Sequence, residues 1–86
     1  MAKGTMRYWA AAKAAAGTPE EPYDAETLAE AIAAAVSGQG RSDEFERVVG
    51  RSSFLVDGVP VGSRAHGSVV LPEGGVVEVL PPFAGG

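Results

Sequence analysis

The sequence predicts a single α+β domain in which a small mixed β-sheet is crossed by one main helix. Three segments support this prediction. Residues 27–36 begin with a Thr-x-x-Glu capping box and carry apolar residues at helical spacing. The dipeptide Asp57-Gly58 separates two apolar extended runs, as in a tight hairpin. Residues 76–80, VVEVL, are apolar enough for a strand at the centre of a sheet.

Length and composition limit the classes of function. The chain has 86 residues, enough for one domain, and no apolar run that could cross a bilayer. It has no cysteine, which excludes disulfides, thiolate metal sites and thiol nucleophiles. A formal net charge of -4 argues against a phosphate-binding surface. We therefore expect a cytoplasmic protein without a metal, a bound cofactor, a nucleic-acid partner or a membrane partner.

The N-terminal segment contains the first predicted strand. Residues 1–4 are expected to be a loose end and residues 5–10 a strand. Alternation then places Met6 and Tyr8 on one face and Trp9 on the other. Trp9 is either half-buried by a neighbour or exposed for a partner.

A short helix and a second strand should follow. Residues 11–16 are rich in alanine and favour one or two helical turns, which Gly17 ends. Residues 18–23 are a candidate strand that contains Pro19 and Pro22. Proline cannot donate a ladder hydrogen bond, so this strand is expected at an edge of the sheet.

The main helix begins at Thr27, whose hydroxyl can accept from the Glu30 amide while the Glu30 carboxylate reaches back. Gly38 stands where a left-handed cap is expected. The apolar positions form one stripe that can cover a sheet, namely Leu28, Ala31, Ile32, Ala35 and Val36.

The C-terminal half completes the layout. Residues 43–49 are read as a further helical turn, residues 53–61 as a hairpin, residues 69–71 as a short extended segment and residues 76–80 as the last strand. First and last strands that are both apolar suggest that the two lie side by side, with the long helix crossing one face. That is a β-grasp layout, occupying residues 1–80.

Residues 81–86, PPFAGG, form a tail after this domain. Pro81 and Pro82 stop the strand because they lack donors and have a restricted φ. Twelve of the 86 residues are glycine, so the terminal pair Gly85-Gly86 arises by chance about one time in fifty. The lone His66 lies in a glycine-flanked stretch without convergent partners and is expected to be an exposed loop residue.

Four stretches together resemble one protein family: the ending VEVLPPFAGG, the opening YWAAAKAAAG, the helix TLAEAIAAAV and the hairpin FLVDGVPV. They look like the small sulfur-carrying subunit of molybdopterin synthase, in the ubiquitin-like MoaD and ThiS superfamily. The resemblance covers nearly the whole chain in matching order, and the tail is its specific part. The chain departs from the family at Gly74-Gly75, where Gly-Asp is common.

The resemblance implies a chemistry for Gly86. A free carboxylate is ionised and is a poor electrophile, so an ATP-using partner must first convert it to an acyl adenylate. Sulfur then replaces oxygen, which gives a Gly86 thiocarboxylate. The implied partners are an E1-like adenylyltransferase, a sulfur donor protein and the larger catalytic subunit of molybdopterin synthase. The chain itself is not expected to be an enzyme.

The resemblance also implies that the tail enters its partners. Glycine lacks Cβ and can pass a narrow channel, so a side chain at Gly85 or Gly86 should obstruct transfer. Phe83 is either an aromatic anchor for a partner groove or a ring folded back onto its own sheet, and Trp9 is a candidate for the same interface. The predicted partner-binding residues are Gly85, Ala84, Phe83, Pro82, Pro81 and Trp9.

Three other functions remain open. The same tail chemistry could serve thiamine, cysteine or another sulfur-containing product. A ubiquitin-like modifier would instead join Gly86 to lysine through an isopeptide bond. In a plain binding module the diglycine would be incidental, since fold alone says little about function.

Overall fold

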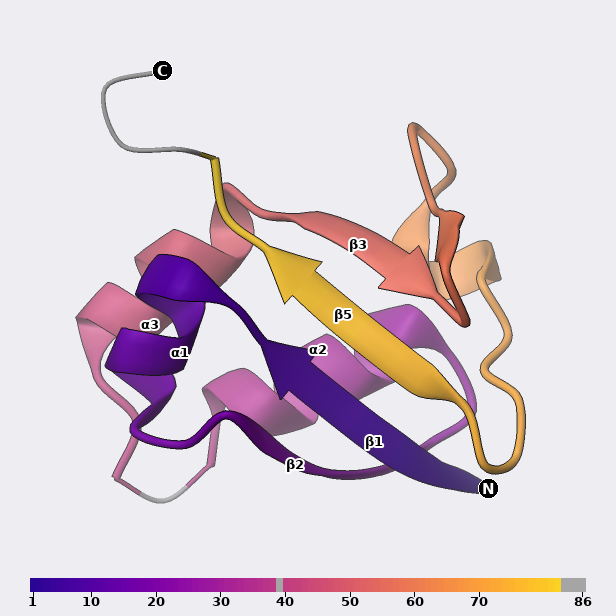
Figure 1. Cartoon of the computed structure of the whole chain (residues 1–86). Helices are drawn as coiled ribbons and strands as arrows, with labels where there is room; N and C mark the ends of the chain where they lie inside the picture. Colours follow the sequence, from indigo (N-terminus) through magenta and orange to yellow (C-terminus); the bar gives the residue numbers. More distant parts are fainter. Residues whose placement is uncertain (39, 83–86) are drawn as a thin grey trace.

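The computed structural model describes residues 1–38 and 40–82, which form a five-stranded mixed sheet in the order β2-β1-β5-β3-β4 (Figure 1). Strand β5 lies at the centre, parallel to β1 and antiparallel to β3. The predicted α+β class, the central last strand and the β-grasp layout are confirmed. The elements are β1 (Ala2–Tyr8), α1 (Ala10–Ala16), β2 (Glu20–Ala25), α2 (Leu28–Val36), α3 (Asp43–Gly50), β3 (Ser53–Val56), β4 (Val59–Pro60), η1 (His66–Ser68) and β5 (Val76–Leu80).

The prediction for the N-terminus was wrong at both ends of the first strand. Residues 2–4 are not a loose end, because Ala2 to Gly4 pair with residues 23–25 of β2. The strand ends at Tyr8, and Ala10, with a φ of 49°, begins α1. The predicted faces are correct, since Met6 and Tyr8 are buried.

Strand β2 is an edge strand, as its prolines predicted. It runs over residues 20–25 rather than 18–23, because Pro19 stays outside the ladder and its carbonyl accepts from Tyr8 N. Pro22 lies opposite Thr5 of β1. An edge strand tolerates proline because only one of its sides is paired.

Helix α2 begins with the predicted cap. Thr27 Oγ1 accepts from Glu30 N at 3.2 Å. The Glu30 carboxylate reaches back past Thr27 and accepts from Glu26 N at 2.9 Å. Both bonds satisfy amides that the helix itself cannot pair.

The predicted left-handed cap at Gly38 was wrong. Ser37 ends the helix with a φ of -86°, and its amide and hydroxyl both donate to the Ala33 carbonyl, at 3.0 and 2.8 Å. Because Ser37 satisfies this terminal carbonyl, no left-handed residue is needed at Gly38. The positive φ of 81° falls at Gly40.

The hydrophobic core lies between the sheet and the helices, which Figure 1 shows on one side of the sheet. Val77 and Val79 of β5 are fully buried, whereas the alternate residues Val76, Glu78 and Leu80 are only half-buried. Strand β5 is therefore central in the sheet but is covered by the helices on one face. The other face of the sheet is open beside β5.

Helix α3, at the segment predicted as a helical turn, directs three apolar side chains inward. Phe45 and Val49 are buried and Val48 is half-buried. The Phe45 ring meets Tyr8 edge-on, with centroids 5.4 Å apart. This contact joins α3 to the first strand.

A polar cluster lies beside this aromatic pair. The Glu21 carboxylate accepts from the Tyr8 hydroxyl and from the Arg41 guanidinium. Arg41 also lies over the Phe45 ring, 4.4 Å from its centroid. The cluster ties β1 and β2 to the segment between α2 and α3, so we assign it a structural role.

This cluster predicts a loss of stability at high pH. Burial, and then the hydrogen bond to Glu21, raise the pKa of Tyr8 above its ordinary value of 10.0. Above that pH the tyrosine of the unfolded chain loses its proton, while Tyr8 of the folded protein keeps it. The stability that buried Tyr8 contributes to the fold is therefore fully present below about pH 10 and falls as the pH rises. Urea unfolding between about pH 8 and about pH 11 should show this fall. Tyr8→Phe should make the slope shallower, and an unchanged slope would contradict the assignment.

The predicted hairpin turn is confirmed. Asp57 and Gly58 have φ values of 50° and 81°, as a tight two-residue turn requires. The Asp57 carboxylate also accepts from Val76 N at 2.8 Å. The turn is thereby tied to the start of the central strand.

Gly75, where the resembled family commonly has Asp, is buried beside Pro72 and Tyr23. The Tyr23 hydroxyl donates to the Pro72 carbonyl at 2.5 Å and fills the space beside Gly75. A Cβ on Gly75 would lie 2.5 Å from Pro72 Cγ and 2.9 Å from Tyr23 Oη. Real Cβ atoms do not approach other atoms so closely, so this packing requires glycine.

Gly75→Ala should therefore destabilise the fold by about 1–3 kcal/mol, because the new methyl group must displace Pro72 or Tyr23. Urea unfolding measures the loss. Gly67→Ala is the control, since a Cβ there meets nothing within 4 Å. Equal stabilities of the two variants would show that the turn adjusts without cost.

Candidate functional site

The root of the C-terminal tail lies at the end of the central strand. Strands β1 and β5 are parallel, so their C-terminal ends lie together, and Trp9 N donates to Val79 O at 3.2 Å. After Leu80 come Pro81, which is half-buried, and Pro82, which is exposed. Pro81 and Pro82 therefore follow the sheet at the end where the C-termini of β1 and β5 lie together.

Four predicted site residues, Phe83, Ala84, Gly85 and Gly86, lie outside the described residues. Their roles stay predictions. The described part of the site consists of Pro81, Pro82, Trp9 and the side chains around them.

Trp9 lies on the open face of the sheet beside this root. The residue is 44% exposed, and its Nε1 donates to Glu78 Oε1 at 3.1 Å across β1 and β5. The next residue, Ala10, holds a left-handed φ of 49°, a conformation that costs energy in a residue other than glycine. The indole is thus fixed next to the last strand rather than buried in the core.

The structure adds a contact that sequence reasoning missed. A small hollow of about 80 Å³ is lined by Ala11 of α1, Val48 of α3, Arg51, Pro81 and Pro82. No local pattern could reveal it, because it forms only where α1 and α3 pack beside the tail root. Arg51, like Trp9, therefore lies near the root of the tail.

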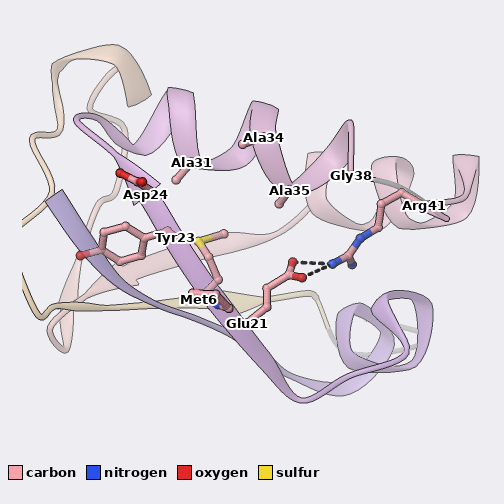
Figure 2. Close-up of a pocket in the computed structure, with 10 residues that line it drawn as sticks. Met6, Glu21, Tyr23, Asp24, Ala31, Ala34, Ala35, Gly38 and Arg41 are labelled. Carbon is pink, nitrogen blue, oxygen red and sulfur yellow. Dashed lines mark hydrogen bonds and ion pairs between the residues drawn. The ribbon is translucent and has the colours of Figure 1, made fainter. Parts of the chain in front are cut away.

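Two of the larger hollows lie beside α2. One, of about 280 Å³, lies between β2 and α2, where Ala31, Ala34 and Ala35 leave space above Met6 and Tyr23 (Figure 2). Two of its charged groups, Glu21 and Arg41, bind each other, as the dashed lines show, and Asp24 also lines it.

The other hollow, of about 420 Å³, lies among α2, α3 and β3. His66 lines it and is exposed, as predicted, and its ring meets Phe54 edge-on at 5.1 Å. Across residues 1–38 and 40–82, no three His, Cys, Asp or Glu side chains gather closely enough to hold a metal ion. No helix in the same residues has the length and apolar character needed to span a membrane.

No family model and no curated protein sequence matches the chain. Its fold is nevertheless similar to several solved structures. The small archaeal modifier protein 1 of Methanosarcina acetivorans has a TM-score of 0.74 and 22% identity, covering 100% of this chain and 98% of the other. A putative molybdopterin converting factor subunit 1 from Pyrococcus furiosus has a TM-score of 0.73 and 23% identity, covering 96% and 100%.

A third similar structure is a complex of subunits 1 and 2 of the molybdopterin-converting factor from Helicobacter pylori, with a TM-score of 0.67, 17% identity and coverage of 98% and 99%. These likenesses span whole chains but have low identity, so they establish the fold. They include proteins of the kind that the sequence resemblance predicted. The chain has the β-grasp, ubiquitin-like fold of these small MoaD-like and modifier proteins.

Proposed function

We propose that this chain is a sulfur carrier for molybdenum cofactor biosynthesis. Gly86 is adenylated by an E1-like partner at the expense of ATP and then receives sulfur from a donor protein, which gives a thiocarboxylate. The chain then donates this sulfur to a pterin precursor inside molybdopterin synthase. In this proposal it is a cytoplasmic, non-catalytic subunit, and the chemistry belongs to its partners.

One observation carries the proposal: the central strand of a β-grasp sheet runs directly into Pro81-Pro82 and a sequence that ends in Gly85-Gly86. Strand β5 is hydrogen-bonded on both sides, so the origin of the tail is held firmly. The four residues beyond Pro82 span at most about 14 Å when extended. That length suits a terminal carboxylate that reacts inside another protein while the domain stays outside.

The structural neighbours support this proposal without deciding the pathway. One is described as a molybdopterin converting factor subunit 1, and another as a complex of subunits 1 and 2 of that factor. We infer by analogy that this chain also docks on a larger catalytic subunit. Carriage of sulfur for thiamine, cysteine or another metabolite is the nearest alternative, because the tail chemistry is the same.

We further propose that Trp9 contributes to docking. A half-exposed indole, oriented by its bond to Glu78 and placed beside the tail root, has the properties of an interface anchor. Trp9→Ala should weaken binding to the adenylating enzyme by at least about 10-fold in a titration, since hot-spot residues contribute this much or more. Val59→Ala is the control, because Val59 is also exposed but lies on the edge strand β4, away from β1 and β5. Equal affinities of the Trp9→Ala and Val59→Ala variants for the adenylating enzyme would show that Trp9 is not part of the interface.

A protein modifier is a second candidate, because three similar structures are described as small archaeal modifier protein 1, one from Methanosarcina acetivorans and two from Haloferax volcanii. In that function Gly86 would form an isopeptide bond with a lysine of another protein. Conjugates of higher mass that contain this chain would then be found in the host.

The decisive test is the intact mass of the chain after incubation with ATP, the adenylating enzyme and a sulfur donor. A sulfur carrier gains about 16 Da as one oxygen is replaced by sulfur at Gly86. Supplying the larger synthase subunit and the pterin precursor should then return the mass to that of the carboxylate. A chain that stays a carboxylate under these conditions, or appears only in conjugates, is not a sulfur carrier.

A further inference from the structure

The hollow of about 420 Å³ among α2, α3 and β3 lies on the helix side of the sheet. Its apolar lining includes Ile32, Ala33 and Val36 of α2, Val49 of α3 and Phe54 of β3. Phe54 pairs with Val79, and both are buried. Trp9 instead donates to Glu78, which precedes Val79 in β5 and points to the other face. The hollow and Trp9 therefore lie on opposite faces of the sheet.

Helix α2 leaves apolar surface uncovered beside this hollow. Its sequence, LAEAIAAAV, contains one charged residue, Glu30. A helix that is apolar on nearly all sides is typical of a protein interior. Within α2, however, only Leu28 and Ala31 are buried. Ile32 and Val36, which line the hollow, are only partly buried by the described part of the chain.

Glu46 gives the lining of the hollow a negative charge. It is exposed on α3, and its carboxylate takes part in none of the ion pairs found within residues 1–38 and 40–82. The Ser52 hydroxyl already donates to the Val48 carbonyl at 2.8 Å, and the His66 ring packs against Phe54. Among the described residues, no lysine or arginine lines the hollow. A complementary occupant therefore combines an apolar body with a positive charge.

We propose that this hollow is a docking surface for an arginine side chain of a partner protein, with an aliphatic residue next to it. The methylene stem of the arginine lies along Ile32 and Val36, and its guanidinium binds the Glu46 carboxylate. Exposed apolar patches with a polar rim are typical of surfaces that bind other proteins. Arginine fits better than lysine because protein interfaces are enriched in arginine, and because its planar group can donate two parallel hydrogen bonds to one carboxylate.

This docking surface goes beyond the proposed sulfur chemistry and does not depend on it. Because Trp9 lies on the opposite face of the sheet, a partner bound at the hollow leaves Trp9 accessible to another protein. The ion pair with Glu46 is exposed to solvent, so the charge contributes mainly to selectivity. The apolar lining contributes the larger share of the affinity.

A nuclear magnetic resonance titration of the full chain with the synthetic peptide acetyl-leucyl-arginyl-leucine amide tests the proposal. The expected shift changes are concentrated on the methyl groups of Ile32, Val36 and Val49. Glu46→Gln should weaken the affinity for the peptide by about two- to five-fold, the range of an exposed ion pair. The same peptide with glutamate in place of arginine should bind the parent chain more weakly by at least about the same factor.

Glu44→Gln is the matched control, because it removes the same charge from the same helix. Glu44 is exposed, pairs with Arg47 and does not line the hollow, so this variant should bind the peptide like the parent chain. Shift changes that are absent, or spread evenly over the surface, would overturn the docking surface. Equal affinities of the parent chain and the Glu46→Gln variant would overturn the role of Glu46.

Two further arms separate the proposed occupant from others. Agmatine carries a guanidinium on a short alkyl chain without a peptide, and agmatine binding as tight as that of the peptide would assign the hollow to a small molecule. Shifts of the Ile32 and Val36 methyl groups on dilution of the chain alone would assign it to a second copy of this chain. Either result would overturn the partner-protein proposal.

Discussion

Deletion of Gly86 is expected to abolish thiocarboxylate formation while leaving the domain as stable as the parent chain. The reacting carboxyl group would move to Gly85, one residue closer to the domain and about 3.5 Å short of its position in an extended tail. A displacement of 1 Å can already cost about 100-fold in rate, so activity should fall below detection. Intact-mass analysis after incubation with ATP, the enzyme and the sulfur donor measures this loss.

Stability provides the internal control for that deletion. The described core lies within residues 6–79, so removing the last residue should leave the urea midpoint unchanged. Glu73→Gln is an activity control, because Glu73 lies in the exposed turn before β5 and, within residues 1–38 and 40–82, its carboxylate accepts a hydrogen bond from Lys3 N alone. A Gly86 deletion that still gains sulfur at the parent rate would remove the terminal residue from the mechanism.

Leu28→Ala is expected to have the largest effect on folding, a loss of about 2–5 kcal/mol of unfolding free energy. Leu28 is 0% exposed and lies at the start of α2, where it packs into the hydrophobic core. Truncation removes apolar contacts and leaves a cavity that the surrounding sheet can fill only in part. Urea unfolding followed by circular dichroism measures the loss.

Ile32→Ala should be milder than Leu28→Ala, although the helical spacing alone gives both residues the same status. Ile32 is only partly buried and lines the open hollow among α2, α3 and β3. Val70→Ala is the surface control, since Val70 is 71% exposed and should change stability by less than about 0.5 kcal/mol. Equal losses at Leu28 and Ile32 would mean that this hollow is closed in solution.

Local signals predicted most of the fold. The Thr27 cap, the Asp57-Gly58 turn and the apolar run of residues 76–80 each depend on chemistry within a few residues, and each appears in the structure. The errors arose where a partner strand or an alternative bond decided the outcome. Residues 2–4 became a strand because β2 pairs with them, and Gly38 lost its capping role because Ser37 satisfies the helix end.

The candidate site shows the same division between what the sequence reveals and what only the packing reveals. The diglycine, the two prolines and the absence of cysteine are visible in the sequence, and they direct attention to Gly86. That Arg51 lines one hollow with Pro81 is not visible in the sequence, because the two are 30 positions apart and only the packing of α3 brings them together. Likewise, the requirement for glycine at Gly75 comes from Tyr23, which is distant in sequence.

The sequence by itself determined the element types, the order of the main elements and the candidate reacting group, because capping, turn geometry, proline and chain termini act locally. The tertiary structure decided which residues lie near Pro81 and Pro82 and which face of the sheet stays open. Those properties depend on how strands pair and helices pack over long separations. Trp9 beside Glu78 and Arg51 beside Pro81 are both products of this packing.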